Sequence, residues 1–585
     1  MCGIFGYQSN KPCDIGEKVI EGLKKLEYRG YDSWGITAKT ANGLNVLKGM
    51  GKVGDVANVG NSNIAIGHTR WATCGKVTKE NAHPHVDCSN KISVVHNGTI
   101  ENYQELREEL IKKGHKFLSH TDTEVIPHLI EEYGKGLDFV EAVKKSMSRV
   151  DGTYALLIVS KDYEGIIAVR NDSPLVIGVA DDGYFIASDV LAFIEHTKKV
   201  IYLDDNEMAT INGGLKIVNM IDNKIVEKAI TKLSWDTEKT KIGEYKHYML
   251  KEIDEQVETI GRAASQDKQK IDGISKKIND AYGVFFIACG SSYHAALCAS
   301  YLFSYITKKH VNVILASEFG NYRDFLTDKT LVVAISQSGE TADVLDAVKT
   351  AKKKGSKIVS IVNVMGSTLT RISDDFLLIN AGPEICVLST KTYTAQLSLL
   401  LLLAYSCVGR YDGGKKEIET IRRIVKVMLS NEVENKIKAL AKKIKDKDHL
   451  YTIGRVINYP TALEAALKIK EVSYIHAEGF AGGELKHGTM ALIEKGTPCI
   501  VFCDYSTLKD ILNNAEEVKA RGGYIIGISP QNNEVFDFFI EVPETENSGC
   551  ITNIIPVQML AYYLAVLRGC DPDMPRNLAK SVTVK

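Results

Sequence analysis

The chain lacks any excess of one charge. It holds 72 lysines and arginines against 73 aspartates and glutamates, and its formal net charge is -1. This balance gives no electrostatic attraction to nucleic acid or to an anionic membrane, so we expect neither as a partner. No basic segment followed by a long apolar run stands at the start of the chain, so no signal peptide is predicted.

Long hydrophobic runs and paired cysteine motifs are missing as well. The apolar stretch Leu397–Tyr405 is far shorter than the ~20 residues of a membrane-spanning helix, and it predicts a buried helix. The twelve cysteines include no C-x-x-C pair, which is typical of free thiols in a reducing cytoplasm, where we expect the protein. No Walker-type loop and no cluster with metal-ligand spacing stand out, so no cofactor and no metal are expected.

Length and composition indicate a soluble protein of several domains. A chain of 585 residues is too long for one core and predicts three or four domains. Its 44% hydrophobic and 25% charged residues are ordinary for a globular protein. We predict domains at 2–235, 248–430 and 440–570, a linker at 236–247 and a C-terminal tail at 571–585.

The N-terminal part has the pattern of a layered α/β domain. Short β-type runs are separated by glycine and polar turns, and two helical patterns interrupt them near Ile15–Leu26 and Asn102–Lys113. These features predict largely antiparallel strands. The clearest predicted strands are Asn63–Gly67, Ile92–His96, Tyr154–Val159, Gly165–Val169, Leu175–Val179 and Tyr184–Ala187.

From Gly283 onward the pattern changes to parallel βαβ units. Short apolar strands alternate with amphipathic helices after a helical stretch at Tyr248–Ala264. A strand followed by glycine occurs at Ile287–Gly290 and again at Tyr451–Gly454, so we predict two doubly wound sub-domains in tandem. The predicted strands are Val284–Ala288, Val311–Leu315, Leu331–Ile335, Lys357–Val362 and Phe376–Ile379, then His449–Ile453, Pro498–Cys503 and Tyr524–Ile528.

Cys2 is the most informative single residue. Trimming of the initiator methionine, which is usual when the second residue is small, makes it the N-terminal residue. Its thiol then stands beside a free α-amine with a pKa of about 7.7–8.0, and this amine can activate the thiol without a histidine. The ordinary alternative is a chance cysteine in a loose terminus.

Four clusters in the first 125 residues add groups that a thiol needs to attack an amide. Arg70 can bind an α-carboxylate through two hydrogen bonds, and Asp122 can pair with an α-ammonium. The Asn97 side chain and the Gly98 N–H can form an oxyanion hole, and Arg29 can hold the terminal region in place. Taken singly, such residues are usually surface charges or turns. The clusters are Tyr28–Ser33, Gly67–Thr73, Asn81–His85 with His96–Gly98, and Thr121–Glu124.

Together the clusters resemble the glutaminase domain of N-terminal-nucleophile amidotransferases, over residues 2–235. The resemblance implies an N-terminal-nucleophile hydrolase fold, with antiparallel sheets between helices. It implies that the terminal cysteine hydrolyses glutamine through a thioester and releases ammonia, and that Trp71 gates an ammonia channel. The residues implied to bind glutamine are Arg29, Arg70, Thr73, His83 and Asp122.

Two predicted strands of the C-terminal part end in turns that suit a phosphate group. Leu331–Ile335 runs into a turn rich in hydroxyls, and Val284–Ala288 leads to Ser291 and Ser292. Helix N-termini and hydroxyls bind phosphate, and open α/β sheets bind ligands at this edge. A capping box without a ligand is the alternative. The polar residues of the first turn are Ser336, Gln337, Ser338 and Thr341.

The second half differs from the first at these positions. Its matching turn lacks glycine, and Asp504 would repel a phosphate, so we expect phosphate only in the first half. The second half instead offers Glu464, Lys468 and Glu471, whose spacing places them on one face of a predicted helix. An exposed ladder of ion pairs is the alternative.

The C-terminal part resembles the tandem sugar-isomerase domains of the glutamine–fructose-6-phosphate aminotransferase family, and the tail Pro575–Val584 matches that family's terminal signature. The resemblance implies that a homodimer converts L-glutamine and fructose 6-phosphate into glutamate and glucosamine 6-phosphate, the first step of amino-sugar synthesis. Lys580 would form a Schiff base with C2 of the ketose. Glu471, assisted by Lys468, would move a proton between C1 and C2, and His487 would help to open the sugar ring across the dimer interface. The implied sugar-phosphate residues are Ser291, Ser292, Ser336, Gln337, Ser338, Thr341, Val387 and Ala579.

The sequence departs from the family pattern at four positions. Trp34 stands where a small residue is expected, and Cys74 where a histidine is expected. Val257 and Thr489 each stand where a proline is expected. Other amidotransferases fit less well: the asparagine-synthetase type needs a Ser-Gly-Gly-rich loop, and the phosphoribosyl type needs an acidic strand end. A deglycase would leave Cys2 unexplained. A sugar-phosphate sensor with a silent glutaminase is disfavoured because the residues for both reactions are present.

Overall fold

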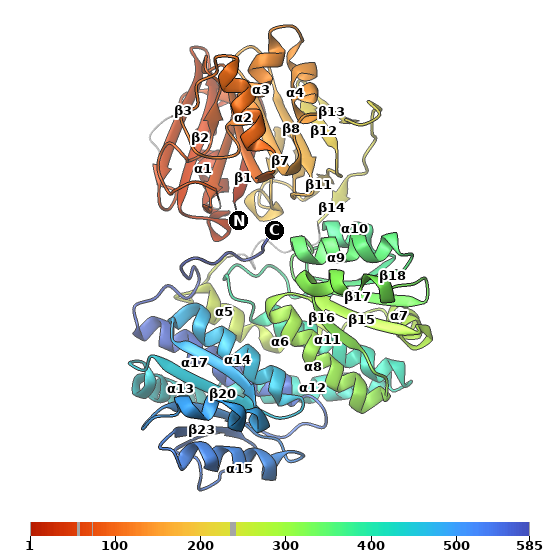
Figure 1. Ribbon diagram of the computed structural model, residues 1–585, viewed down its shortest axis with the longest axis vertical. Helices are drawn as coiled ribbons and strands as arrows, with labels where there is room; N and C mark the ends of the chain where they lie inside the picture. The colour runs from red at the N-terminus through yellow and green to blue at the C-terminus, as the bar shows by residue number, and fades with distance from the viewer. Residues whose placement is uncertain (1, 55–58, 73, 234–240, 584–585) are drawn as a thin grey trace. The chain divides into compact units, whose positions relative to one another are not determined.

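The computed structural model describes residues 2–54, 59–72, 74–233 and 241–583 (Figure 1). The chain divides into two compact units. The first comprises Met1–Thr237 together with Ala579–Lys585, and the second comprises Glu238–Leu578.

Two antiparallel sheets face each other in the first unit. Apolar side chains such as Ile4 and Ile66 of one sheet and Leu157 of the other fill the space between them. The eight-stranded sheet has the order β14-β11-β9-β10-β1-β4-β2-β3, and the six-stranded sheet has the order β13-β12-β8-β7-β6-β5. The strands are β1 Gly3–Cys13, β2 Ser33–Thr40, β3 Gly43–Met50, β4 Ser62–Arg70, β5 His85–Val86, β6 Ile92–Ile100, β7 Gly152–Ser160, β8 Ile166–Asn171, β9 Val176–Ala180, β10 Gly183–Ala187, β11 Lys199–Tyr202, β12 Glu207–Ile211, β13 Leu215–Asn219 and β14 Thr231–Lys232.

Helices cover the outer faces of both sheets. α1 (Ile15–Lys24) packs on the eight-stranded sheet through its apolar face, which includes Val19. The helices α2 (Tyr103–Lys112), α3 (Val125–Gly134) and α4 (Phe139–Met147) pack on the six-stranded sheet. The resulting layers run helix, sheet, sheet, helix, which confirms the predicted antiparallel α/β domain.

Two parallel five-stranded sheets frame the second unit. Their orders are β16-β15-β17-β18-β19 and β21-β20-β22-β23-β24, so the same winding order occurs twice and confirms the predicted pair of doubly wound sub-domains. The direction in which strands are added reverses between β15 and β17 in the first sheet and between β20 and β22 in the second. Doubly wound folds bind ligands at this point. The strands are β15 Gly283–Ala288, β16 Asn312–Leu315, β17 Thr330–Ser336, β18 Lys357–Val362, β19 Asp375–Leu378, β20 His449–Gly454, β21 His476–Ala481, β22 Pro498–Phe502, β23 Tyr524–Ser529 and β24 Phe538–Glu541.

Helices connect these strands and pack on both sides of each sheet. They are α5 Tyr248–Asp254, α6 Gln256–Ala263, α7 Lys268–Asp280, α8 Gly290–Thr307, α9 Ala342–Lys353, α10 Thr368–Ile372, α11 Lys391–Cys407, α12 Tyr411–Met428, α13 Asn431–Ile444, α14 Asn458–Ser473, α15 Leu508–Lys519, α16 Gly549–Thr552 and α17 Ile554–Leu567.

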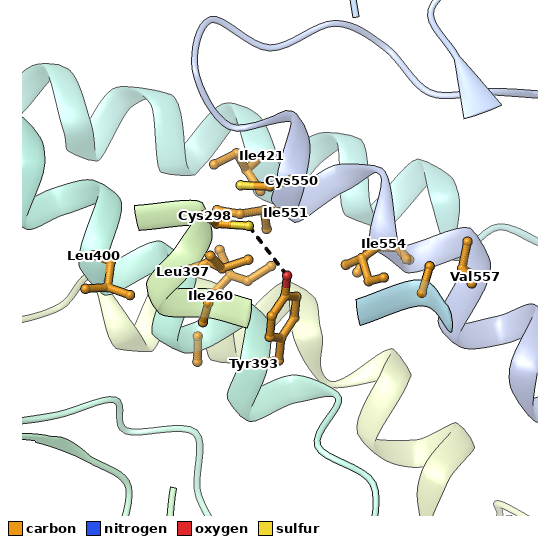
Figure 2. Packing of buried hydrophobic residues seen from close by; sticks show 14 of the residues in the cluster. Ile260, Cys298, Tyr393, Leu397, Leu400, Ile421, Cys550, Ile551, Ile554 and Val557 are labelled. Atoms are coloured by element: carbon orange, nitrogen blue, oxygen red, sulfur yellow. Dashed lines mark hydrogen bonds between the residues drawn. The ribbon is translucent and has the colours of Figure 1, made fainter. Parts of the chain in front are cut away.

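One hydrophobic core serves both sub-domains of the second unit. Helix α11 is buried from Lys391 to Ser406, with its apolar run Leu397–Tyr405 at the centre, and this confirms the buried helix predicted there. Figure 2 shows Tyr393 and Leu397 of α11 near Cys298 of α8 and Ile551 of α16. Because α8 connects β15 and β16 of the first sheet and α16 follows the last strand of the second sheet, the two sub-domains share buried side chains.

The most apolar helical stretch also belongs to this core. Among the described residues, Gly549–Leu567 is the stretch long and apolar enough to cross a membrane, yet 83% of it is buried inside the protein. Its composition is therefore explained by packing within the second unit.

Two edge strands of the second parallel sheet were not predicted from the sequence. β21 contains glycine, histidine and glutamate, and β24 is only four residues long. The helix expected at Tyr248–Ala264 is interrupted at Glu255, where α5 ends and α6 begins. The predicted linker lies partly outside the described residues.

We expect Leu400→Ala to destabilise both sub-domains together. Leu400 is fully buried in α11, and truncating such a side chain typically costs about 2–5 kcal/mol. Calorimetry should show the unfolding of the second unit shifted to lower temperature as one transition. The control Val427→Ala truncates a side chain that is 55% exposed, and should change stability by less than about 0.5 kcal/mol. Separate transitions for the two sub-domains would contradict a shared core.

Candidate active sites

The backbone of Cys2 is held in place by two side chains. Its carbonyl oxygen accepts hydrogen bonds from Asn97 Nδ2 at 2.9 Å and from Arg29 Nε at 3.2 Å. Its sulfur lies 3.4 Å from the Trp71 backbone nitrogen and 3.5 Å from the Trp71 carbonyl oxygen. The terminal cysteine is therefore fixed between β6, which carries Asn97, and the end of β4, which Trp71 follows.

The Cys2 thiol needs a base before it can act as a nucleophile. Burial raises the pKa of Cys2, although the Trp71 N–H and the charge of Arg70 lower it in part. A thiol with a raised pKa is protonated at neutral pH, so another group must remove its proton. The α-amine expected on Cys2 lies close enough to remove it, because both groups belong to the same residue.

A buried histidine orients the Asn97 amide. His68 Nε2 lies 3.1 Å from Asn97 Oδ1 and 2.9 Å from the His96 carbonyl oxygen. Because both neighbours are acceptors, Nε2 carries the proton and donates it. Burial lowers the pKa of His68 to about 3, which keeps the ring neutral. With Oδ1 accepting from His68, the donor end of Asn97 faces Cys2, as an oxyanion hole requires.

Gly98 has a conformation that a side chain would not tolerate. Its φ is +134°, and a Cβ would lie 2.0 Å from the Thr153 carbonyl oxygen on β7. The pairing of β6 with β7 therefore demands glycine directly after Asn97.

Arg29 supports the terminal residue. Besides Cys2, its guanidinium contacts the Asp189 carboxylate at 3.3 Å, and only 5% of Arg29 is exposed. Asp189 also accepts a hydrogen bond from the Tyr28 hydroxyl at 2.7 Å. Asp189 gave no signal in the sequence because it lies far along the chain, after β10.

Arg70 and Asp122 are both buried near the thiol, and the charge of each affects the pKa of Cys2. The Arg70 guanidinium donates to carbonyl oxygens of the loop after β4, including that of Lys76 at 3.2 Å. Asp122 accepts from the Ile100 N–H at 2.8 Å. The structure thus brings both predicted glutamine-binding charges to the neighbourhood of Cys2, with Arg70 also holding the adjacent loop.

His83 lies in a layer of buried rings. It stacks on His68 with ring centroids 4.0 Å apart, and its Nδ1 accepts from the His96 N–H at 3.3 Å. Burial lowers the pKa of His83 well below its ordinary value. Its contacts support His68, and its role in glutamine binding stays a prediction. Thr73 lies outside the described residues.

The turns predicted to bind phosphate lie at the point where the winding of the first parallel sheet reverses. Strand β15 leads into Ser291 and Ser292 at the start of α8, and its neighbour β17 leads into the turn before α9. Ser336 Oγ lies 3.0 Å from Thr341 Oγ1, and Gln396 Nε2 donates to Ser292 Oγ at 3.0 Å. Hydroxyls from neighbouring strand ends therefore gather at one edge of the sheet.

The carboxylates near the two strand ends behave differently. In the first half, Glu340 accepts from the Thr368 N–H at the start of α10 at 2.7 Å. In the second half, Asp504 Oδ1 accepts from the Thr507 N–H and hydroxyl, both at 2.8 Å, and from the Ser506 hydroxyl at 2.7 Å. Asp504 occupies the donors that a phosphate would need, which agrees with phosphate binding in the first half alone.

Lys468 and Glu464 are buried, so the exposed ladder of ion pairs is excluded. Lys468 is 1% exposed and Glu464 is fully buried. Lys468 Nζ lies 3.4 Å from Glu464 Oε1 and 3.0 Å from Ser291 Oγ. It also lies 2.8 Å from Glu471 Oε2, as an ion pair without a well-directed hydrogen bond. Charges at this depth remain only where partners balance them.

The start of α8 completes the surroundings of Glu464. His294 Nδ1 lies 2.7 Å from Glu464 Oε2, and Ser291 donates to Oε1 at 2.8 Å. The N-terminal end of a helix also favours an anion. His294 was missed in the sequence, although its spacing from Ser291 places both on one helix face.

The buried pair stays ionised. Burial alone would raise the pKa of Glu464, but Lys468 and His294 lower it below its ordinary value. Burial alone would lower the pKa of Lys468, but Glu464 and Glu471 raise it. Lys468 is therefore a fixed cation beside Glu471, suited to stabilising negative charge and unsuited to acting as a base.

The C-terminal tail docks on the second unit as far as Arg576. The Asp573 carboxylate accepts from the N–H groups of Tyr248 and Met249 at 2.8 and 2.7 Å, at the start of α5. The Asp573 carbonyl oxygen accepts from the Val387 N–H at 3.0 Å. The Arg576 N–H donates at 2.8 Å to the hydroxyl of Tyr474, which follows α14. Val387 thus lies against the tail.

The roles of three further predicted residues stay predictions. Ala579 and Lys580 follow the last residue of the second unit, and their roles stay predictions. His487 is exposed on the 3-10 helix η5 (Gly482–His487), and its role across a dimer interface stays a prediction as well.

Comparison with known proteins identifies both parts of the chain. The model of the glutamine amidotransferase domain matches residues 1–238, and that of the SIS domain matches residues 277–406 and 443–568. Two relatives are named glutamine--fructose-6-phosphate aminotransferase [isomerizing], one from Thermococcus kodakarensis and one from Pyrococcus horikoshii. Each is 46% identical to this chain. The alignments extend over 607 and 601 residues and cover the full length of this chain and of each relative. The chain belongs to the glutamine–fructose-6-phosphate aminotransferase family. Membership confirms both resemblances predicted from the sequence.

A solved structure of the same family matches the second unit. The C-terminal domain of glucosamine-fructose-6-phosphate aminotransferase from Francisella tularensis is 35% identical, with a TM-score of 0.53, and the match covers 57% of this chain and 100% of that chain. The two parallel sheets are therefore an architecture that this aminotransferase family shares.

Glu464→Gln should slow the sugar chemistry of this aminotransferase while leaving glutamine hydrolysis intact. The substitution keeps the shape of the side chain but removes the charge that holds Lys468, Ser291 and His294. We expect isomerisation of fructose 6-phosphate, followed with a coupled dehydrogenase, to slow by about 100-fold, a typical effect of misplaced catalytic groups. The control Glu432→Gln changes an exposed carboxylate of α13. Isomerisation as fast in Glu464→Gln as in this control would contradict the assignment.

Proposed function

We propose that this aminotransferase releases ammonia from glutamine at Cys2 and adds it to fructose 6-phosphate at the cluster around Lys468. The family reaction consumes glutamine and fructose 6-phosphate and forms glutamate and glucosamine 6-phosphate. The observation that supports the first site most strongly is the clamp of Asn97 and Arg29 on the backbone of Cys2, next to Trp71.

At the first site, the α-amine of Cys2 would take the thiol proton while Sγ attacks the amide carbon of glutamine. The second N–H of Asn97 Nδ2 and the Gly98 N–H would hold the charge that develops on the amide oxygen. The C–N bond breaks as the nitrogen gains a proton, ammonia leaves, and water hydrolyses the thioester to glutamate. Arg70 would bind the α-carboxylate and Asp122 the α-ammonium.

At the second site, the hydroxyls at the ends of β15 and β17 would bind the phosphate. Lys580 would form an imine with C2 of the open ketose by loss of water, and ammonia would then replace the lysine. Glu471 would take a proton from C1 and return it at C2, which converts the ketimine into the aldose. Lys468 would stabilise the negative charge of the intermediate.

Ammonia would pass within the protein, and two chains would assemble. Trp71, whose backbone contacts the Cys2 thiol, would gate the exit of ammonia. The chain would act as a cytoplasmic homodimer joined through the sugar-isomerase domains. The exposure of His487 suits a role in ring opening at the partner's site.

Cys2→Ala should abolish glutamine hydrolysis and leave sugar isomerisation in place. Cys2 alone presents a thiol and an α-amine on one residue. Glutamate release should fall to background in an enzyme-coupled assay, while the conversion of fructose 6-phosphate to glucose 6-phosphate continues. Cys13→Ala, at the far end of β1, is the matched control. Near-normal glutamate release by Cys2→Ala would show that the nucleophile is another residue.

Lys580→Ala should abolish glucosamine 6-phosphate formation while glutamine hydrolysis remains. An ordinary lysine has a pKa near 10.4, so a Schiff-base lysine needs burial or a nearby cation to become neutral. Borohydride reduction of the parent enzyme with fructose 6-phosphate should leave a hexitol phosphate on Lys580, detected by mass spectrometry. Lys585→Ala is the matched control in the same tail. An adduct elsewhere, together with an active Lys580→Ala enzyme, would remove Lys580 from the mechanism.

A further inference from the structure

Four side chains with metal-binding atoms converge in the first unit. They are Cys88 after β5, His115 after α2, and His128 and Glu131 on α3. One ligand atom from each lies within 4.8 Å of all the others. The sequence alone does not indicate this cluster, because its residues come from three separate segments and match no metal-binding spacing.

The distances within this cluster suit a small tetrahedral ion. Cys88 Sγ lies 3.7 Å from His115 Nδ1 and 3.5 Å from His128 Nδ1. Glu131 Oε2 lies 3.0 and 3.5 Å from the same two nitrogens. Zinc bonds of about 2.0–2.1 Å to nitrogen and oxygen and about 2.3 Å to sulfur place neighbouring ligand atoms roughly 3.3–3.6 Å apart. A modest adjustment would bring all four onto one ion.

A bound cation and hydrogen bonds would use these four groups differently. Each Nδ1 carries either one proton or one lone pair. Without a metal, the Cys88 thiol can donate to one ring nitrogen while the other ring donates to Glu131. A cation at the centre would instead accept lone pairs from all four groups at once.

The outer atoms of the cluster are arranged as metal ligands require. His115 Nε2 lies 3.2 Å from Glu132 Oε2, and His128 Nε2 is buried 3.8 Å from Glu124 Oε1. Metal-binding histidines commonly direct their second nitrogen to a carboxylate in this way. The Lys116 N–H also donates to Cys88 Sγ at 3.4 Å, which suits a thiolate.

We propose that Cys88, His115, His128 and Glu131 form a structural zinc site. One thiolate, two imidazoles and one carboxylate are ligands that zinc prefers, and four protein ligands leave no position for a reacting water. Cys88 is exposed, so the ion has an open route from solvent. The proposal does not depend on the function proposed above.

The site would stabilise the segment that leads to Asp122. Glu124 accepts from the N–H groups of Leu118 and Ser119, both at 2.7 Å, and lies beside His128. Zinc on His128 and His115 would therefore fix both ends of the loop between α2 and α3. Loss of zinc should loosen this loop and lower the melting temperature of the first unit.

Metal analysis of the full-length protein tests the site. Protein produced with zinc in the medium and passed through a desalting column should hold about one zinc per chain by mass spectrometry. Cys88→Ser and His115→Ala should each lose at least nine-tenths of it, while Cys13→Ala, which changes another partly exposed cysteine of the unit, keeps it. Cobalt in place of zinc should give a thiolate-to-metal absorption band that Cys88→Ser lacks.

A strong chelator should lower the melting temperature of the parent protein, and added zinc should restore it. The same treatment should leave Cys88→Ser unchanged. Absence of zinc from the parent, zinc retained by both ligand variants, or an equal chelator effect in parent and Cys88→Ser would each overturn the proposal. Stoichiometric iron in place of zinc would overturn the choice of metal.

Discussion

Glu464 is a fully buried carboxylate of the second unit. It can stay ionised there only because neighbouring groups balance its charge. Its partners are Lys468 on the same helix, and Ser291 and His294 on α8. α8 belongs to the first sub-domain and α14 to the second, so the network spans both. Removing one partner from a buried pair typically costs about 3–5 kcal/mol. The cluster around Lys468, where we propose that the sugar reacts, therefore forms only when both sub-domains are folded around their shared core.

The first unit positions Cys2 with a neutral histidine–asparagine pair and a balanced ion pair. His68 stays uncharged and fixes the amide of Asn97, whose other end binds the carbonyl oxygen of Cys2. Arg29 binds the same oxygen, and its charge is balanced by Asp189. Cys2, the proposed nucleophile, is thus positioned through its backbone carbonyl, and neither of these two contacts involves its thiol.

Local patterns were enough to predict most strands, the two doubly wound sub-domains and the residues grouped around Cys2. They could place Glu464 and Lys468 on one helix face but not predict their burial, because the partner His294 comes from 170 residues earlier. Edge strands such as β21 were not predicted, because they bury little apolar surface. The departure at Trp34 is explained only in three dimensions: Gly49 lies opposite on β3, and a Cβ there would be 2.4 Å from the indole.

The most direct test of the joint action of the two sites is to measure the source of the nitrogen atom in the product. The full-length enzyme can be given fructose 6-phosphate, glutamine labelled with heavy nitrogen in its amide group, and an excess of unlabelled ammonium. If ammonia released at Cys2 passes within the protein to the sugar, nearly all glucosamine 6-phosphate will carry the label in mass spectrometry. A product labelled only in proportion to free ammonium in solution would contradict that transfer.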